Sequence, residues 1–253
     1  MVAKKKGGHN KMPNWVRTRI MLGSSEKTLE LAKALCDENG DVDFNKLVPM
    51  PEELCVEESS KGSDGLALIV AKTDPAVTTY GKKSEKRVRI TNTSKRLYER
   101  IMCMSYDPKC IDIALSREDT EEKRAEAIEL GNRLIENYKK YGNSSWYGWR
   151  IDHWGTKWNA KNTIIDAEHK TIEFDTAWNA PEPLFHHISE KTDAKIAFLY
   201  ADEDIGYNQG YSLWCKGHCD YDGCFDNGSE DAKKLACDVW GCDYDDYKEE
   251  GAE

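Results

Sequence analysis

The hydrophobic positions near the start of the chain follow first the period of a strand and then that of a helix. Residues 15–22 alternate apolar and basic side chains, which predicts a strand with one buried face. Ser24 supplies a helix N-cap, and apolar residues then recur at helical spacing for about three turns. Residues 43–51 predict a second strand that ends at prolines, because proline cannot continue a central ladder.

The next part of the chain, residues 52–142, carries mainly helical periodicity. Residues 94–104 and 118–141 each place apolar side chains along one helical face, and the second segment gathers acidic residues in its first turns. Residues 61–85 predict a loop that contains one short strand at 66–70. We therefore expect residues 52–142 to form a mainly helical insertion between two strands of one sheet.

After residue 142 the strand pattern returns. Pro181 and Pro183 mark the start of a helix, because proline is tolerated in the first helical turn. Strands are predicted at residues 149–154, 162–165, 170–175, 195–200 and 210–214. Residues 13–51 and 143–214 are thus expected to form one core domain of α+β class, an antiparallel sheet with packed helices.

Composition places the chain among globular proteins. Its 253 residues are 39% hydrophobic and 32% charged, and no run approaches the roughly 20 apolar residues that a membrane span needs. The lysines near the N-terminus precede no apolar stretch, so we expect no secretory signal. Nine cysteines, an odd number, then predict reduced thiols in a bacterial host cytosol, with no membrane contact.

The charge is distributed unevenly along the chain. Residues 1–12 predict a basic, flexible arm, and residues 72–100 carry a surplus of six basic charges. The net charge of −10 is concentrated at the other end, where residues 201–253 hold an excess of eleven acidic residues. Such a segment is either a solvated face or an acidic surface that binds basic partners. The candidate acidic patch consists of Asp220, Asp222, Asp226, Asp243, Asp245 and Asp246.

Tryptophan is concentrated in residues 146–158, which hold four tryptophans and a tyrosine. If residues 149–154 form a strand, aromatic side chains lie on both of its faces. One face would pack in the core, and the other could stack on bases or nucleotides, as sheets of RNA-recognition modules do. The candidate ligand-binding residues are Arg150, Trp154, Lys157, Trp158 and Trp178. The alternative is that the whole cluster builds the core.

The sequence after residue 214 contains the nearest approach to a metal cluster. Zinc favours closely spaced ligand pairs such as C-x₂-C, and no such pair occurs in the chain. A structural zinc therefore competes with the alternative of reduced, unligated thiols, and no other cofactor is expected. The candidate ligands are Cys215, His218, Cys219 and Cys224, with Cys237 and Cys242 downstream.

The sequence offers little to support catalysis. The adjacent histidines His186 and His187, and His153 beside Asp152, could form acid–base pairs, but histidines in such places are more often surface residues. No phosphate-binding loop, nucleophile elbow or zinc-protease motif is present. We therefore expect a protein that is not an enzyme.

Four blocks of sequence together resemble the YubB-like family, a ferredoxin-like family carried by phages and plasmids. The blocks are residues 12–20, 44–51, 149–160 and 174–183. The resemblance covers residues 12–51 and 146–214 and implies a ferredoxin-like sandwich with a helical insertion. It implies no catalytic residues, and the Cys-rich, acidic segment 215–253 departs from the family pattern.

Two functions remain open from the sequence. The first is a non-enzymatic interaction protein of a phage or plasmid that binds and inhibits a host factor through its acidic surface. Such a factor could be a defence system, as in anti-CRISPR proteins, and the partner would be a host protein, possibly a basic nucleic-acid-binding one. The second is a protein that sequesters a nucleotide, a cyclic nucleotide or single-stranded nucleic acid on the aromatic sheet face. The oligomeric state is open.

Overall fold

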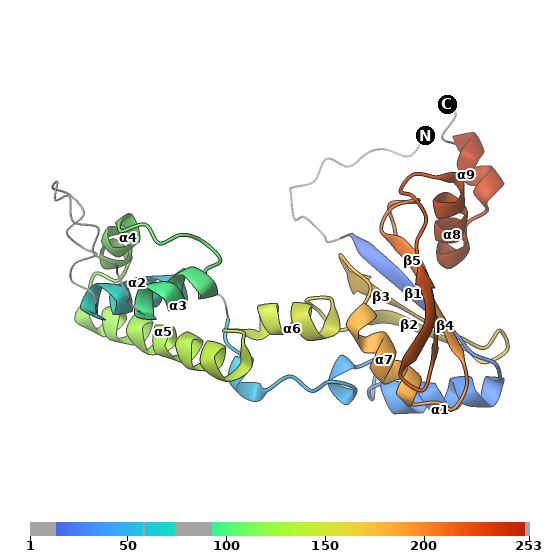
Figure 1. Cartoon of the computed structure of the whole chain (residues 1–253), viewed down its shortest axis with the longest axis horizontal. Helices are drawn as coiled ribbons and strands as arrows, with labels where there is room; N and C mark the ends of the chain where they lie inside the picture. Colours follow the sequence, from blue (N-terminus) through green and yellow to red (C-terminus); the bar gives the residue numbers. More distant parts are fainter. Residues whose placement is uncertain (1–13, 58, 74–92, 251–253) are drawn as a thin grey trace. The chain divides into compact units, whose positions relative to one another are not determined.

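The computed structural model describes residues 14–57, 59–73 and 93–250. The predicted basic arm, residues 1–12, and most of the basic stretch at 72–100 lie outside the described residues. The chain divides into two units, Met1–Pro49 with Arg150–Glu253, and Met50–Trp149 (Figure 1). The first unit holds the sheet and the second is helical.

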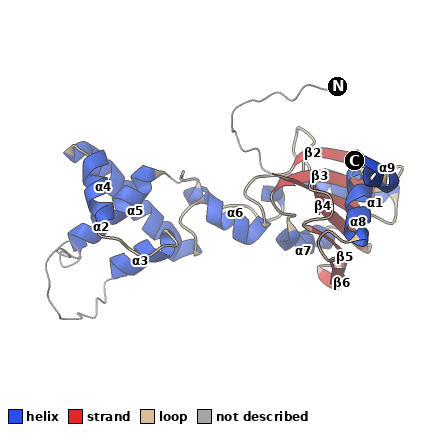
Figure 2. Cartoon of the chain, turned by 90° about the horizontal axis from the view of Figure 1, so that it is seen from above, coloured by secondary structure: helices blue, strands red, loops and turns tan. Residues whose placement is uncertain are grey.

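The first unit contains six antiparallel strands among its described residues, in the order β2-β3-β1-β4-β5-β6 (Figure 2). The strands are β1 Trp15–Met21, β2 Lys161–Asp166, β3 Thr171–Ala177, β4 Ile196–Asp202, β5 Gln209–Cys215 and β6 His218–Gly223. Helix α1 (Ser25–Leu35) follows β1, and α7 (Glu182–Glu190) joins β3 to β4. The order β2-β3-β1-β4 with these two helices is the ferredoxin-like arrangement, so the predicted fold class is confirmed.

The core of this unit follows from the alternation in β1. Val16, Thr18 and Ile20 are fully buried, while the arginines between them are not. Ile20 lies opposite Ile172 of β3 and Phe198 of β4, so these three side chains share one face of the sheet. Helix α7 covers this face, where Phe185 stacks on Phe198 with ring centroids 4.0 Å apart.

Helix α8 (Glu230–Trp240) packs against β1, β4 and β5. Its Ala236 and Val239 are buried against Ala201 of β4. Arg19, which lies on the face of β1 opposite to Ile20, donates to the carbonyl oxygens of Asp238 and Val239 at 2.8 and 3.2 Å. Helix α8 therefore covers the second face of the sheet, and the short helix α9 (Tyr244–Glu250) follows it.

The C-terminal segment is thus part of the fold rather than an appendage to it. We predicted that the sheet closes at residue 214 and that residues 215–253 form a separate extension. In the structure, β6 pairs with β5 as a further edge strand, with a register shift between Leu213 and Trp214. The prediction missed β6 because its residues are mostly polar and exposed, which is common in an edge strand.

The second unit is built from helices around a core of its own. It contains the 3₁₀ turn η2 (Glu52–Leu54) and the helices α2 (Ser60–Thr73), α3 (Thr93–Ile101), α4 (Lys109–Arg117) and α5 (Glu121–Tyr141). Helices α2 and α5 cross where Gly65 meets Ala127 and Gly131, and a Cβ on Gly65 would lie 1.8 Å from the Ala127 carbonyl oxygen. Helix α5 begins at an N-cap, Thr120, and ends at Gly142 with φ +76°.

Three predicted strands are absent from the described residues. Residues 66–70 lie in α2, because a short apolar run fits a buried helix as well as a strand. Residues 43–51 contain the 3₁₀ turn η1 (Phe44–Lys46), and only the neighbouring Val42 forms an isolated bridge, to Cys36. Residues 149–154 belong to helix α6 (Trp146–Trp154).

No helix among the described residues combines the length and apolar character that crossing a membrane requires. This finding agrees with the absence of a long apolar run in the sequence.

Candidate functional site

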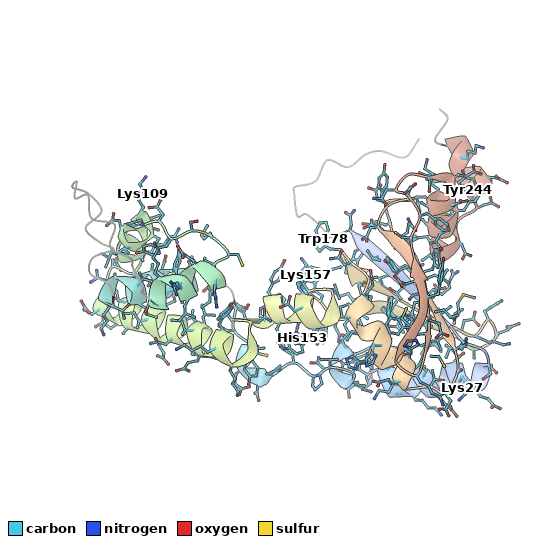
Figure 3. All side chains as sticks on the ribbon, viewed as in Figure 1. Lys27, Lys109, His153, Lys157, Trp178 and Tyr244 are labelled. Carbon is cyan, nitrogen blue, oxygen red and sulfur yellow. The ribbon has the colours of Figure 1, made fainter. Side chains whose placement is uncertain are left out.

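Five residues gather at the end of the sheet where β1 begins, and we call them the indole–lysine cluster. Trp15 is the first residue of β1 and Lys161 the first of β2, while Trp178 directly follows β3. Lys157 and Trp158 lie between α6 and β2. Trp15 pairs with Ala177 and Lys161 with Asp175, so strand register brings these residues to one end of the sheet. Figure 3 labels two members of the cluster, Lys157 and Trp178.

The distances within the cluster are those of cation–π and aromatic contacts. The Trp15 and Trp158 rings lie 6.3 Å apart between centroids. The Lys157 Nζ atom lies 4.0 Å from the Trp158 centroid and 5.9 Å from that of Trp178. The Lys161 Nζ atom lies 5.9 Å from the centroids of both Trp15 and Trp158. Ammonium groups and indole faces therefore form one continuous surface.

This surface is accessible to a ligand. The Trp178 residue is 43% exposed and Lys161 is exposed, while Trp15, Lys157 and Trp158 are half-buried. Within the described ranges, no carboxylate forms an ion pair with Lys157 or Lys161. The two ammonium groups can therefore bind an external anion.

The carboxylates close to the cluster are already engaged. Asp175 accepts a hydrogen bond from Arg17 Nε at 2.9 Å and one from Asn162 Nδ2 at 3.0 Å. The Glu203 carboxylate accepts from the backbone N–H of Trp15 at 3.1 Å. The Arg17 guanidinium offsets the charge of Asp175, whereas Glu203 is hydrogen-bonded to a neutral donor and keeps its charge.

The backbone of Trp178 is strained. Its φ is +71°, in a region that residues other than glycine rarely adopt, bulky ones least of all. The Trp178 N–H donates to the Asn14 carbonyl and its carbonyl accepts from Asn208 Nδ2, both at 2.9 Å. Such strain costs about 1–3 kcal/mol and is concentrated at functional sites. An exposed indole held in this conformation is therefore a second indication of a binding surface.

The structure brings together three of the five predicted ligand-binding residues, Lys157, Trp158 and Trp178. Trp154 is fully buried instead, and its Nε1–H donates to the Val48 carbonyl at 2.9 Å. Arg150 lies one helical turn before Trp154 and stacks on its ring at 4.8 Å. Both assignments depended on a strand at 149–154, and the helix turns Trp154 into the core.

Sequence reasoning missed Trp15 and Lys161. Trp15 was read only as an apolar position in the alternation of β1. The pairing of β1 with β3, which connects positions 150 to 162 residues apart in the chain, brings Trp15 to its neighbours in the cluster.

The six candidate acidic residues lie on different elements. Asp220 and Asp222 are in β6, and Asp220 forms an ion pair with Lys195 at 3.0 Å. The carboxylate of Asp243 accepts from the backbone N–H of Asp245 at 2.8 Å, next to the start of α9. Asp226 lies in the loop before α8, and Asp246 is in the first turn of α9. These carboxylates therefore follow two separate parts of the fold rather than one element.

The four candidate zinc ligands do not converge. Cys215, His218 and Cys219 follow the β5–β6 hairpin, and Cys224 comes just after β6. Within the part of the chain that the structure describes, the group of three potential ligands that meets closely is His186, His187 and Glu190 on α7. All nine cysteines are free thiols. The pKa of Cys237 is raised to about 12, mainly by burial and secondly by a hydrogen bond with Cys242.

The helical unit contains a cavity of about 380 Å³. Four serines and three apolar residues line it: Ser59, Ser60, Ser63, Ile101, Met102, Leu134 and Ser144. Among the described residues that line it, none is a histidine, a cysteine or a carboxylate that could activate a serine hydroxyl.

Comparison with known proteins supports the fold of the first unit. The family described as a ferredoxin-like domain in Api92-like protein matches residues 153–243, which hold β2 to β6 with α7 and α8. A solved structure, protein Api92 from Yersinia pseudotuberculosis, has 12% sequence identity and a TM-score of 0.35, and the comparison covers 86% of this chain and 100% of that one. No curated protein matches the chain. The family match, over residues 153–243, is to a ferredoxin-like domain in the C-terminal region of the chain.

Proposed function

We propose that this protein binds single-stranded nucleic acid on the indole–lysine cluster. The observation that carries the proposal is the meeting of Trp15, Trp158 and Trp178 with two lysines that lack a carboxylate partner among the described residues. Bases stack on exposed aromatic rings with about 1–3 kcal/mol each, and lysines beside the rings attract the phosphates.

A single strand fits the cluster better than a mononucleotide or a duplex does. Trp158 and Trp178 both lie next to Lys157, so successive bases can stack on two rings with a phosphate between them. In a duplex the base faces are hidden within the stack. The proposal assigns no reaction to the site, and the expectation that the chain is not an enzyme remains a prediction.

The test is fluorescence anisotropy of labelled DNA and RNA oligonucleotides of about 12 nucleotides, within the site sizes known for such surfaces. We expect Trp158→Ala and Trp178→Ala each to weaken binding by roughly 5- to 100-fold, the loss that removing one stacked base implies. Lys157→Gln and Lys161→Gln should each remove one phosphate contact. The slope of log affinity against log salt concentration should therefore fall in magnitude by about one for each variant.

The chain supplies matched controls. Tyr221 is 58% exposed on β6, away from the cluster, and Lys170 is an exposed lysine between β2 and β3. Tyr221→Ala and Lys170→Gln should leave the affinity unchanged. Equal losses in the control and cluster variants, or tighter binding of a duplex, would rule out this assignment.

The interaction-protein hypothesis from the sequence ranks second. Inhibition of a host factor by an acidic surface, the YubB-like assignment and an origin in a phage or plasmid all stay predictions. The six aspartates lie on β6, in the following loop and at α9, and one of them, Asp220, is already paired with Lys195.

A further inference from the structure

The last turn of α7 carries a group of three potential metal ligands. Ligand atoms of His186, His187 and Glu190 all lie within 4.8 Å of one another. His186 and Glu190 are exposed and His187 is half-buried, so an ion can reach them from solvent.

Helix geometry explains why these positions meet. Glu190 follows His187 by three residues and His186 by four, and both spacings bring side chains together on a helix surface. Its carboxylate therefore lies one turn beyond the two imidazoles and between them. The two distances to it are 3.7 Å from His186 Nε2 and 3.6 Å from His187 Nδ1.

These distances suit ligands that share an ion better than ligands that bond to each other. They exceed the usual length of a hydrogen bond. Atoms that bind one tetrahedral zinc at about 2.0–2.1 Å lie roughly 3.3 Å from one another. Both distances to Glu190 are close to this separation, and the ligand atoms of all three residues lie within 4.8 Å of one another, so rotation of the side chains is needed to bring them around one cation.

A contact with the β5–β6 hairpin fixes the tautomer of His186. Its Nδ1 atom lies 2.7 Å from the Gly217 carbonyl oxygen, which can only accept. Nδ1 therefore carries a proton and donates, and in the neutral imidazole Nε2 presents its lone pair on the side of Glu190. Metal-binding histidines commonly donate their second nitrogen to a backbone carbonyl in this way.

The hairpin turn is closely fitted to this part of α7. Gly217 has φ +80°, and a Cβ there would lie 2.9 Å from His186 Cε1 and 3.0 Å from Glu190 Cγ. A glycine at this position lets the carbonyl that orients His186 approach the helix. The orienting contact is therefore built into the fold of the sheet.

We propose that His186 Nε2, His187 Nδ1 and a Glu190 carboxylate oxygen bind a divalent transition-metal ion of the zinc class. Two imidazoles and one carboxylate suit zinc, nickel and copper, whereas magnesium and calcium prefer oxygen ligands. Three protein ligands leave at least one position for water or an exogenous ligand. All three ligands belong to α7, and the Nδ1 contact of His186 with Gly217 connects one of them to the β5–β6 hairpin. This site is independent of the proposed nucleic-acid surface.

The test must separate imidazole from thiol ligation, because the chain has nine free cysteines. The full chain, labelled with ¹⁵N-histidine, is titrated with zinc chloride and followed by NMR of the ring nitrogens of its six histidines. We expect the resonances of His186 Nε2 and His187 Nδ1 to shift, while His186 Nδ1 keeps its proton.

Variants define the ligand set. His187→Ala and Glu190→Gln should each weaken the zinc affinity, read from the His186 signal, by at least about 10-fold. Loss of a residue that only orients a ligand already costs about 10- to 100-fold, so loss of a ligand should cost no less. His169→Ala is the matched control, because His169 also lies beside a carboxylate, Asp166 at 2.7 Å, but without a third ligand. This control should leave the affinity unchanged.

Two outcomes would overturn the proposal. In one, zinc binds but the His186 and His187 ring signals stay in place, which assigns the ion to thiols. In the other, Glu190→Gln and His169→Ala have the same effect, which indicates nonspecific surface binding.

Discussion

At the residue scale, the tryptophans of this chain take opposite roles. Trp154 is fully buried, packs edge-on against Phe44 and donates its indole N–H to a backbone carbonyl. Trp178 is exposed, lies beside Lys157 and has a strained backbone conformation. The first is a core residue, and the second is the strongest single candidate for ligand contact.

The strain at Trp178 predicts that a glycine variant is more stable than an alanine variant, the reverse of the usual order. Trp178→Gly should unfold at a higher urea concentration than Trp178→Ala, because alanine keeps a Cβ in the left-handed region at a cost of about 1–2 kcal/mol. The greater entropy of glycine in the unfolded chain offsets about 0.5–1 kcal/mol of this difference. We expect a net advantage of about 1 kcal/mol for glycine in equilibrium unfolding. An alanine variant as stable as the glycine variant would show that the backbone at Trp178 is not strained.

A second residue-scale prediction concerns pH. The pKa of His169 is raised above its ordinary value of 6.5. The larger cause is the hydrogen bond from His169 Nδ1 to Asp166, and the smaller is the negative charge of Asp166. Protonated His169 therefore stabilises the β2–β3 turn below about pH 6.5, and this contribution is lost as the pH rises through the folded pKa. NMR titration should find the raised pKa in the native chain and an ordinary one in Asp166→Asn. The same pKa in both proteins would contradict the ion pair.

At the element scale, the way α2 and α5 pack in the helical unit is explained by a close approach of their backbones, and not by buried apolar area alone. Helices α2 and α5 approach each other through glycines, and Gly65 faces the backbone of Ala127 without room for a side chain. Gly62 lies one turn earlier on α2, where a Cβ would meet side chains rather than backbone: the end of Leu134 at 3.0 Å and Leu130 at 3.6 Å.

These two glycines give a paired prediction. Gly65→Ala should destabilise the helical unit by about 3 kcal/mol, because the helices must move apart to accept the added methyl group. Gly62→Ala should be neutral or slightly stabilising, because alanine favours the helix by about 1 kcal/mol and the leucine can rotate. Chemical denaturation followed by circular dichroism measures both changes. Equal effects of the two substitutions would refute the close approach at Gly65.

The element scale also shows what the sequence could predict. The alternation in β1 predicted that strand, because only a period of two fits it, and the prolines at the start of α7 predicted that helix, because proline is tolerated in the first turn. Residues 149–154 have aromatic side chains at both odd and even positions, so their pattern fitted a strand and a helix alike. The helix was therefore missed, and with it the burial of Trp154.

The candidate site was predictable only in part, for a related reason. Lys157 and Trp158 are adjacent in sequence, whereas Trp15 joins them through strand register. The histidines of α7 were visible as a pair, but the contact that orients His186 comes from Gly217, 31 positions away. Local patterns predict elements well, while sites depend on pairings between distant segments.

At the scale of the whole molecule, the chain consists of two units with separate cores. The helical core is formed by residues such as Leu66, Ala127 and Leu134, and all of its members come from the unit Met50–Trp149. The core of the other unit contains Trp154, Phe174 and Phe198. Separate cores allow separate unfolding.

We therefore expect two unfolding steps that respond to different substitutions. In native-state hydrogen exchange, Gly65→Ala should lower protection in α2 and α5 and leave β1 and β4 unchanged. Trp154→Ala should do the reverse, with a loss of about 3–5 kcal/mol in the sheet unit. A single transition that both substitutions shift equally would contradict the division into independent cores.

The central claim is that single-stranded nucleic acid contacts the indole–lysine cluster. Photo-crosslinking of a bound oligonucleotide to the full chain, with the crosslinked peptides identified by mass spectrometry, tests this contact directly. We expect crosslinks at Trp158 and Trp178, which disappear when both residues are replaced by alanine. Crosslinks found solely in the basic residues 1–12 or 72–100, and unchanged by these substitutions, would contradict it.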